Sequence, residues 1–262
     1  MKNSLHTFVV LAYKESSFLE ECIKSVINQS VKSNVVIATS TKNDYISNLA
    51  KKYKLRLIVN KEQKGIGYDF DFALNCVNSK LVTIAHQDDI YEVDYLKKIL
   101  EYYNKYNDSI ILFTDYFEIR NSNRVYNNRN LKIKKILLKP LKLYNLNNLK
   151  FIKRLSIRFG CAICCPSVTF NKDKCPKKVF KSNFKSNVDW FAWEKLSLMK
   201  GRFTYIPKPL MGHRIHEGSE TSNVLNNNIR INEDREMFNK FWPKFITNIL
   251  IKFYKKAEES NN

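Results

Sequence analysis

The sequence has few acidic residues, few glycines and no long apolar run. Its 262 residues include 25 Asp and Glu against 45 Lys and Arg, which leaves a formal net charge of +20 at pH 7. A basic excess of this size favours anionic partners such as nucleic acid, anionic lipid headgroups or phosphorylated small molecules. The abundance of Lys, Asn and Ile beside only six Gly also permits a second cause, a codon bias that raises lysine throughout the chain.

No stretch of the chain approaches the roughly 20 apolar residues that a membrane-spanning helix requires. The apolar stretch in the N-terminal MKNSLHTFVVLAY is too short for a signal peptide. Six cysteines are scattered without the spacing of a disulfide framework or of a structural zinc site. We therefore expect a cytoplasmic chain with reduced thiols.

The first 120 residues contain a regular alternation of short apolar runs and amphipathic stretches. Such alternation predicts an α/β fold, with a mostly parallel central sheet flanked by helices on both faces. Ligands of such sheets bind at the carboxyl ends of the strands. The strands are expected at 7–12, 34–40, 55–60, 81–86 and 109–119, with helices between them.

The character of the chain changes after Arg120. From there to Lys172 it holds thirteen Lys and Arg and no Asp or Glu, interleaved with Leu and Ile at near-helical spacing. This predicts a basic helical insertion over 120–158. Beyond it we expect strands at 163–171 and 202–207, a helix at 188–200, a turn-rich segment at 207–222 and a helical tail over 223–262.

Two adjacent aspartates, Asp88 and Asp89, follow the fourth expected strand in TIAHQDDIYE. Adjacent carboxylates repel each other unless a cation or a hydrogen-bond network compensates. Hard oxygen ligands suit Mg²⁺ or Mn²⁺, which bridge to substrate phosphates. The alternative is that Asp89 caps the next helix and Asp88 is merely solvated.

Four motifs, in this order, resemble those of family 2 glycosyltransferases with the GT-A fold. They are VVLAYKESSFLEECIKSVINQS, KLVTIAHQDDIYEVDYLKKI, NVDWFAWEKL and PKPLMGHRIHEGSETS. The resemblance covers most of residues 6–222 and implies a catalytic domain over 1–222. Within it, about 1–118 would bind the nucleotide sugar and about 119–222 the acceptor, and the helical tail would follow.

By position in these motifs, the resemblance implies a role for each of several residues. Asp88 would be the principal ligand of a metal on the donor diphosphate, with Asp89 supporting it and His216 completing the shell. Asp189 would be the catalytic base that takes the acceptor's proton in an inverting transfer; the alternative is a helix N-cap. The residues expected around the donor are Ala12, Tyr13, Glu15, Thr39, Ser40, Asp71, His86, Gln87, Asp88 and Arg214.

The chain departs from the family pattern at three places around the donor. His86 stands where the family has the first aspartate of the metal motif, so one negative charge is lost. ATSTKND replaces an acidic base-reading signature, which leaves hydroxyl groups and a displaced Asp44. GIGYDFDFAL replaces an ARN element, with Asp71 at the family's asparagine. Near Asp189, Trp190 and Trp193 can either stack on a sugar or belong to the core.

Two basic segments, 129–158 and FNKFWPKFITNILIKFYKK near the C-terminus, have the composition of interfacial helices that meet anionic lipid. The alternative is that their apolar faces pack on the domain and leave the lysines in water.

The sequence thus predicts an inverting glycosyltransferase that depends on Mg²⁺ or Mn²⁺. It would move a sugar from a nucleotide-diphosphate donor to a saccharide or lipid-linked oligosaccharide. The donor expected first among the candidates is a UDP-sugar. The expected setting is bacterial surface polysaccharide or lipopolysaccharide assembly, with peripheral contact at the inner face of the cytoplasmic membrane. Two alternatives are a sugar nucleotidyltransferase, which would need a glycine-rich loop in place of AYKESS, and a nucleic-acid-binding protein, for which we find no recognition motif.

Overall fold

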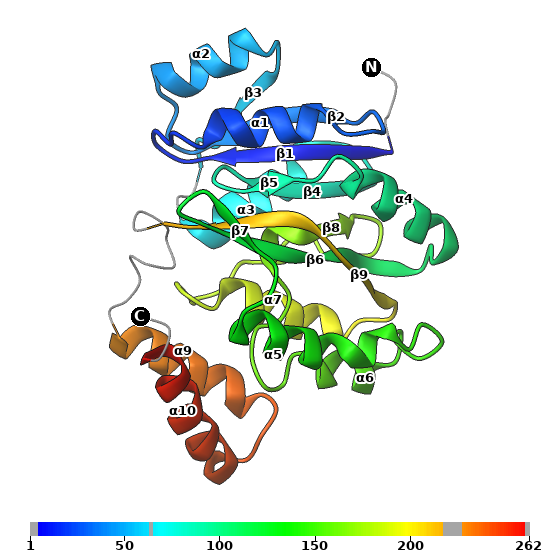
Figure 1. Ribbon diagram of the computed structural model, residues 1–262, viewed down its shortest axis with the longest axis vertical. Helices are drawn as coiled ribbons and strands as arrows, with labels where there is room; N and C mark the ends of the chain where they lie inside the picture. Colours follow the sequence, from blue (N-terminus) through cyan, green and yellow to red (C-terminus); the bar gives the residue numbers. More distant parts are fainter. Residues whose placement is uncertain (1–4, 63–64, 217–226, 260–262) are drawn as a thin grey trace.

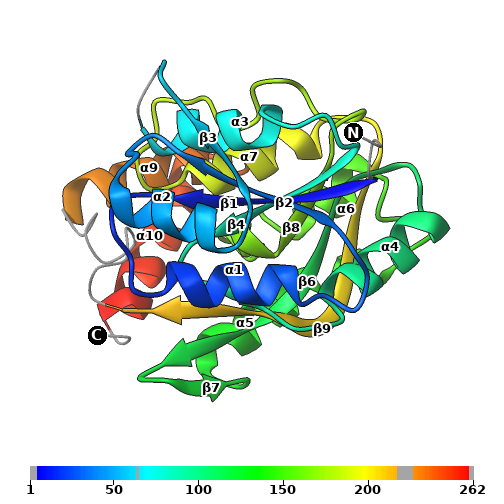
Figure 2. The ribbon, with the colours of Figure 1, turned by 90° about the horizontal axis from the view of Figure 1, so that it is seen from above.

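A computed structural model describes residues 5–62, 65–216 and 227–259. In this part of the chain nine strands form one sheet, in the order β3-β2-β1-β4-β8-β6-β9-β5 with β7 beside β6. Helices cover both faces of the sheet (Figure 1, Figure 2). The expected α/β class is therefore confirmed, with a mixed sheet in which four strand pairings are parallel and four are antiparallel.

Four neighbouring strands on one side of the sheet run parallel. They are β1 (His6–Ala12), β2 (Asn34–Thr39), β3 (Arg56–Val59) and β4 (Leu81–His86). Ala12 pairs with Thr39, and Leu11 pairs with His86. The carboxyl ends of β1, β2 and β4 therefore meet at one edge, where a ligand site is expected.

Two apolar cores bury the continuous apolar runs of these strands. One face of the sheet packs on α3 (Ile66–Asn75) and α7 (Val188–Ser197). The other packs on α1 (Leu19–Ile27), α2 (Asp44–Lys52) and α4 (Tyr95–Lys105). Successive residues of β1 alternate between the two cores, as the period of a strand requires.

The other side of the sheet is mixed. Strand β8 (Val168–Asn171) runs antiparallel to both β4 and β6 (Ser109–Arg120), while β6 runs parallel to β9 (Arg202–Ile215). The strand expected over 163–171 is shorter than predicted, because a 3₁₀ turn, η2 (Cys165–Ser167), precedes it. Two short strands, β5 (Ile90–Tyr91) and β7 (Asn123–Val125), complete the sheet.

The turn-rich reading of 207–222 is wrong over 207–215, which belong to β9. The prolines that suggested turns sit where the pairing of β6 and β9 shifts, between Thr114 with Ile206 and Asp115 with Pro209. A proline lacks an N–H for the ladder, so a bulge is where a strand tolerates it. Residues 217–222 lie outside the described residues.

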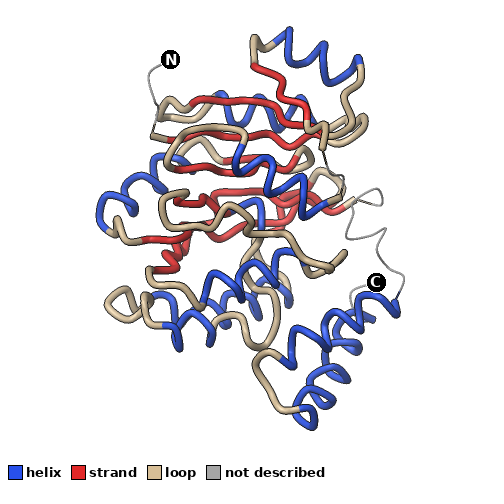
Figure 3. The backbone as a smooth tube through the Cα atoms, turned by 180° about the vertical axis from the view of Figure 1, so that it is seen from behind, coloured by secondary structure: helices blue, strands red, loops and turns tan. Residues whose placement is uncertain are grey.

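The basic insertion is helical but not one helix. It forms α5 (Arg129–Leu138), the 3₁₀ turn η1 (Lys139–Lys142) and α6 (Lys150–Leu155), with Pro140 at the break. The tail forms α9 (Asn227–Asn239) and α10 (Lys244–Glu259), which lie side by side at one end of the molecule (Figure 3). No helix in the described part of the chain is long and apolar enough to cross a bilayer.

Trp190 and Trp193 are fully buried in the core. Trp190 packs on Phe238 of α9 and Tyr254 of α10, with ring centroids 5.1 and 6.4 Å away. Sugar stacking by these two tryptophans is therefore excluded, and the tail is part of the same body as α7.

Candidate active site

The two adjacent aspartates at the end of β4 have different surroundings. Asp89 is 1% exposed, and its Oδ1 accepts the backbone N–H of Arg214 at 2.9 Å and lies 3.0 Å from His213 Nδ1. Burial raises the pKa of Asp89, but His213 and these hydrogen bonds outweigh it, so the net pKa is lowered. Asp89 thus fastens β9 to the end of β4. It does not cap α4, which begins at Tyr95.

The Asp88 side chain is partly exposed to solvent at the end of β4. Its side chain is 25% exposed, and the Ser16 hydroxyl donates to its Oδ1 at 2.7 Å. His216 Nε2 lies 3.4 Å from its Oδ2. Only Asp88 of the pair is therefore open to a ligand, and His216 lies where the sequence placed it.

Arg214 is brought beside Asp88, as expected, but its guanidinium already has partners. Nε donates to the Asp88 backbone carbonyl at 2.9 Å and Nη2 donates to Glu21 at 2.5 Å. The guanidinium also lies over the Phe18 ring at 4.3 Å. Arg214 therefore shapes the rim around Asp88, and Glu21, which the sequence did not indicate, holds it there.

His86, which the resemblance places in the metal motif, ends β4 with a buried ring nitrogen. Its Nε2 is buried and has no hydrogen-bond partner among the described residues. Its ring lies 5.0 Å from the ring of Phe70. Burial lowers the pKa of His86, which keeps the imidazole neutral at pH 7. A buried polar atom left unpaired costs about 1–3 kcal/mol, so a ligand that bonds to Nε2 would be favoured.

The loops after β1 and β4 are tied together by Gln87. Its side chain accepts from the Tyr13 N–H at 2.9 Å and donates to the Tyr13 carbonyl at 3.0 Å. The Tyr13 ring remains 45% exposed, and Glu15 is exposed too, whereas Ala12 is buried. Gln87 therefore sets the rim of the site through the backbone, leaving the Tyr13 ring open to solvent.

The segment after β2, which includes Ser40, is held by a carboxylate from α3. Ser40 donates to Asp69 Oδ2 at 2.8 Å and Asn60 donates to Asp69 Oδ1 at 2.9 Å. The Thr39 hydroxyl accepts the N–H of Thr41 at 3.0 Å. Asp69 was not indicated by the sequence, because nothing in GIGYDFDFAL distinguishes it from the neighbouring Asp71.

The donor contact expected of Asp71 is contradicted by its hydrogen bonds. Its two oxygens accept the backbone N–H groups of Val179, Phe180 and Lys181 at 2.7, 3.0 and 2.9 Å. Gly67 serves the same contact, because a Cβ there would lie 2.8 Å from the Phe180 carbonyl oxygen. Asp71 therefore holds the segment before α7.

Glu233 of α9 holds the other end of that segment. Its carboxylate accepts the N–H groups of Lys185, Ser186 and Asn187 at 2.7, 2.8 and 2.9 Å, and it is buried. The neighbouring Asp234 accepts from the Asn187 side chain at 2.7 Å. The tail thus fixes the start of α7, which the sequence did not reveal.

Asp189 is the second residue of α7, so it is not the N-cap, which is Asn187. Its Oδ1 accepts the N–H of Trp190 at 2.7 Å and its Oδ2 accepts the Cys161 thiol at 3.3 Å. Burial raises the pKa of Asp189 although these bonds lower it. A carboxylate with a raised pKa at the edge of a ligand site suits a general base.

Lys134 enters the same region from α5. Its ammonium lies 2.9 Å from the Tyr116 hydroxyl, and the Tyr116 ring meets the His213 ring edge-on at 6.1 Å. In the sequence Lys134 was one lysine among many in the basic insertion, and only the fold shows that it points inward.

A family model described as glycosyl transferase family 2 matches residues 7–178, well over half of the chain. The chain belongs to this family. A related uncharacterized glycosyltransferase of Haemophilus influenzae is 25% identical over 243 residues, covering 85% of this chain and 68% of the relative. Glycosyltransferase GlyA of Streptococcus pneumoniae is 24% identical over 235 residues, 81% of this chain and 31% of that protein. The chain thus spans about a third of GlyA.

Solved structures of glycosyltransferases share the fold of this family 2 enzyme. TarS 1–349 of S. aureus in complex with UDP-GlcNAc gives a TM-score of 0.65 at 16% identity, covering 95% of this chain and 70% of that one. The mannosyltransferase PcManGT of Pyrobaculum calidifontis, in complex with GDP-Man and Mn²⁺, gives 0.58 at 15% identity, covering 94% and 68%. The GT-A fold and the glycosyltransferase class are therefore both confirmed.

The side chains of this glycosyltransferase fit a divalent cation only as part of a larger shell. The described residues contain no group of three or more His, Cys, Asp and Glu that could hold a metal ion by itself. Asp88 and His216 can offer one ligand each, since they lie 3.4 Å apart at the rim. That fits Mg²⁺ or Mn²⁺, which use one or two carboxylates and take the rest from phosphates and water. Asp89 lies behind this site.

Proposed function

We propose that this glycosyltransferase moves a sugar, with inversion, from a nucleotide-diphosphate donor to a hydroxyl of a saccharide or lipid-linked acceptor. The observation that carries the proposal is the pair of groups at the end of β4, Asp88 and His86, with the carboxylate of Asp189 coupled electrostatically to His86. Asp88 is open to a ligand, His86 has an unpartnered nitrogen, and Asp189 has a raised pKa. The charge of Asp189 acts to raise the pKa of His86, which supports placing both groups at one site.

Each group has a distinct part in the proposed transfer. Asp189 accepts the proton of the acceptor hydroxyl as its oxygen attacks the anomeric carbon. Asp88 and His216 would hold a divalent cation, which would supply positive charge to the diphosphate leaving group. His86, being neutral, donates or accepts one hydrogen bond to the donor without adding charge.

A UDP-sugar is the donor that we propose first. The structural neighbour TarS binds UDP-GlcNAc, while PcManGT binds GDP-Man, so these are the two bases to test first. The setting that we propose is assembly of a bacterial surface polysaccharide or lipopolysaccharide at the inner face of the cytoplasmic membrane. Both relatives with sequence similarity are bacterial, which supports that setting.

A thermal-shift screen of nucleoside diphosphates, each with and without Mn²⁺, tests the proposal directly. We expect one nucleotide to raise the melting temperature, and to do so only with metal. At a concentration 100 times the dissociation constant, the stabilisation would be about 2.7 kcal/mol. If no nucleotide shifts the transition under either condition, the donor assignment is wrong.

A further inference from the structure

The large apolar side chains that face solvent are concentrated in the basic insertion and in the tail. Sixteen are exposed in the described residues, and eleven of these lie between 126 and 159 or between 245 and 253. The other five, which are scattered over the rest of the molecule, are Leu5, Tyr13, Ile27, Val93 and Leu198. Single exposed apolar residues are ordinary, but a concentration of them indicates a binding surface.

The most regular part of this surface is one stripe on α10. Phe245, Ile249 and Phe253 are 67%, 52% and 69% exposed. Their spacing of four residues places them on a single face of the helix. We call these three residues the α10 stripe.

The fold uses the opposite face of the same helix. Thr247 and Ile251 are buried, and Tyr254 packs on Trp190 and Phe238. A helix that is apolar on two sides is normally buried on both. In α10 only one side has a partner, so the α10 stripe is not explained by the packing of this chain.

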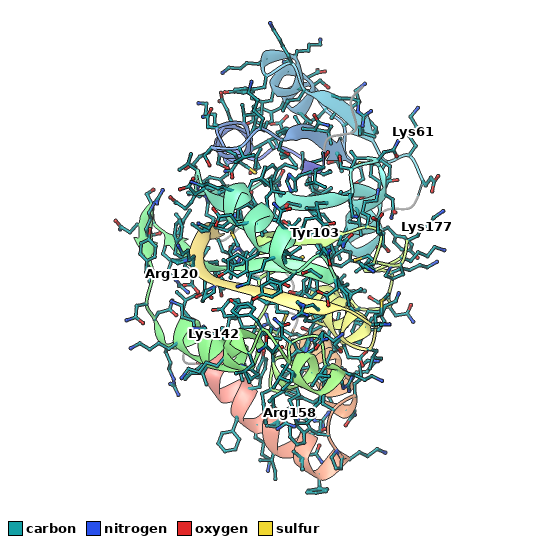
Figure 4. All side chains as sticks on the ribbon, turned by 90° about the vertical axis from the view of Figure 1, so that its right-hand side faces the viewer. Lys61, Tyr103, Arg120, Lys142, Arg158 and Lys177 are labelled. Atoms are coloured by element: carbon teal, nitrogen blue, oxygen red, sulfur yellow. The ribbon has the colours of Figure 1, made fainter. Side chains whose placement is uncertain are left out.

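The insertion joins the tail to make one continuous body below the sheet. The Arg154 guanidinium lies 4.5 Å from the Phe241 ring and donates to the Lys240 carbonyl at 2.8 Å. The Phe159 and Trp242 rings are 5.1 Å apart. Figure 4 shows Lys142 and Arg158 at this end of the molecule, and Figure 1 shows α5, α6 and α10 together there.

The insertion carries charged side chains of one sign only. Residues 120–158 contain no Asp or Glu, and the exposed lysines of the insertion form no ion pair within the described residues. Lys244 and Lys252 lie next to the stripe in α10 and are exposed as well. Lysines that flank an apolar helix face match a layer of anionic headgroups over hydrocarbon.

We propose that the α10 stripe and its flanking lysines dock this enzyme on an anionic lipid bilayer, with α10 lying in the plane of the headgroups. A second copy of the chain fits this face less well, because it would bring two sets of lysines together. The biological sense of the docking rests on the proposed function, since a lipid-linked acceptor lies at such a surface. The binding itself is measured without donor or acceptor.

Sedimentation of the full chain with lipid vesicles tests the docking. We expect binding to vesicles of mixed phosphatidylcholine and phosphatidylglycerol, weaker binding to phosphatidylcholine alone, and release by added salt. The double variant Phe245→Ser/Phe253→Ser should bind at least about tenfold more weakly, since each lost aromatic insertion removes a favourable apolar transfer. Lys244→Gln/Lys252→Gln should weaken binding and reduce its salt dependence.

The matched control is Ile27→Ser/Leu198→Ser, which removes two exposed apolar side chains elsewhere. It should bind vesicles as the parent does. All variants are exposed substitutions, so circular dichroism and nucleotide binding should be unchanged, which separates lost docking from lost folding.

Three outcomes would overturn the docking. The first is that Phe245→Ser/Phe253→Ser binds vesicles as tightly as the control Ile27→Ser/Leu198→Ser. The second is that the parent binds neutral and anionic vesicles equally. The third is that the parent is an oligomer and that Phe245→Ser/Phe253→Ser dissociates it. The last would show that a second copy covers the stripe. A chain that binds vesicles but no nucleotide would instead refute the proposed function and leave the docking intact.

Discussion

Carboxylates in two regions of this molecule differ in what their oxygens contact: in one region the carboxylate is open to a ligand, and in the other the carboxylates bind the backbone. At the end of β4, Asp88 accepts one hydroxyl and lies near one imidazole, and a quarter of its side chain remains exposed. Asp71 and Glu233 are buried, and each accepts three backbone N–H groups from the segment before α7. A carboxylate is available to a ligand only where the backbone has not already filled its oxygens.

The second region also explains what the tail contributes. Asp71 comes from α3 and Glu233 from α9, and together they hold residues 179–187 at both ends. Asp189 follows two residues later. The position of the proposed base is therefore set by two carboxylates whose oxygens accept backbone N–H groups.

Removing the base should have the largest effect. In Asp189→Asn the amide cannot accept the acceptor's proton, so transfer should fall by about 10²- to 10⁴-fold. Nucleotide binding should persist, because Asp88 and His86 are untouched. Initial rates and nucleotide titrations measure the two properties. The control is Asp173→Asn at an exposed ion pair with Lys80, and normal turnover by Asp189→Asn would refute its role.

Breaking a carboxylate that holds the backbone should lower stability next most strongly. In Glu233→Gln one oxygen becomes an NH₂ group that faces backbone donors, so we expect a loss of about 2–4 kcal/mol in the free energy of unfolding. Asp71→Asn should behave in the same way. Urea unfolding measures the loss, with Glu236→Gln, an exposed change on the same helix, as the matched control. Unchanged stability in both variants would remove the distinction between the two regions.

The strands of the donor half could be predicted to within a residue or two because each is a local apolar run with a helix after it. The reversal of β8 could not, because it depends on pairing with β4 and β6 from distant parts of the chain. The same holds for 207–215, which pair with β6 from a distant part of the chain. In the sheet, a Cβ at Gly212 would lie 2.7 Å from the Phe117 ring, so the glycine serves strand packing.

For the candidate site, the sequence placed the carboxylates at the end of β4 and in α3 but could not assign a contact to each of them. Asp69 and Asp71 stand two apart in one helix, yet one holds the loop after β2 and the other holds the segment before α7. Asp88 and Asp89 differ in the same way. Which oxygens are filled depends on backbone groups that fold against them, and sequence spacing does not record those.

Asp88→Asn should show that the open carboxylate has the opposite profile to the buried ones. We expect the unfolding free energy without ligand to change little, since among the described residues one hydroxyl and one imidazole contact this half-buried side chain. The metal-dependent stabilisation by nucleotide should disappear, a loss of up to about 2.7 kcal/mol at 100 times the parent's dissociation constant. Thermal shifts with and without Mn²⁺ measure both. Full metal-dependent stabilisation in the variant would place the cation elsewhere.

The smallest expected effect is a shift in the pH dependence of transfer, which is set by the surroundings of Asp189. Burial raises the pKa of Asp189 above its ordinary 3.8, and a base must be ionised to accept a proton. Transfer should therefore fall as the pH drops through that raised pKa, so the acid limb lies above 3.8. The Cys161 thiol opposes the shift by donating to Asp189.

Cys161→Ala should consequently move the acid limb to higher pH. On that limb the variant should be about two- to fivefold slower than the parent, the worth of one hydrogen bond, and equal to it on the alkaline plateau. Cys175→Ala, at a thiol that bonds only the Ile110 carbonyl, should leave the profile unchanged. If the acid limb of Cys161→Ala lies at the same pH as that of the parent, a group other than Asp189 limits the rate in acid, because the thiol bonds Asp189 directly.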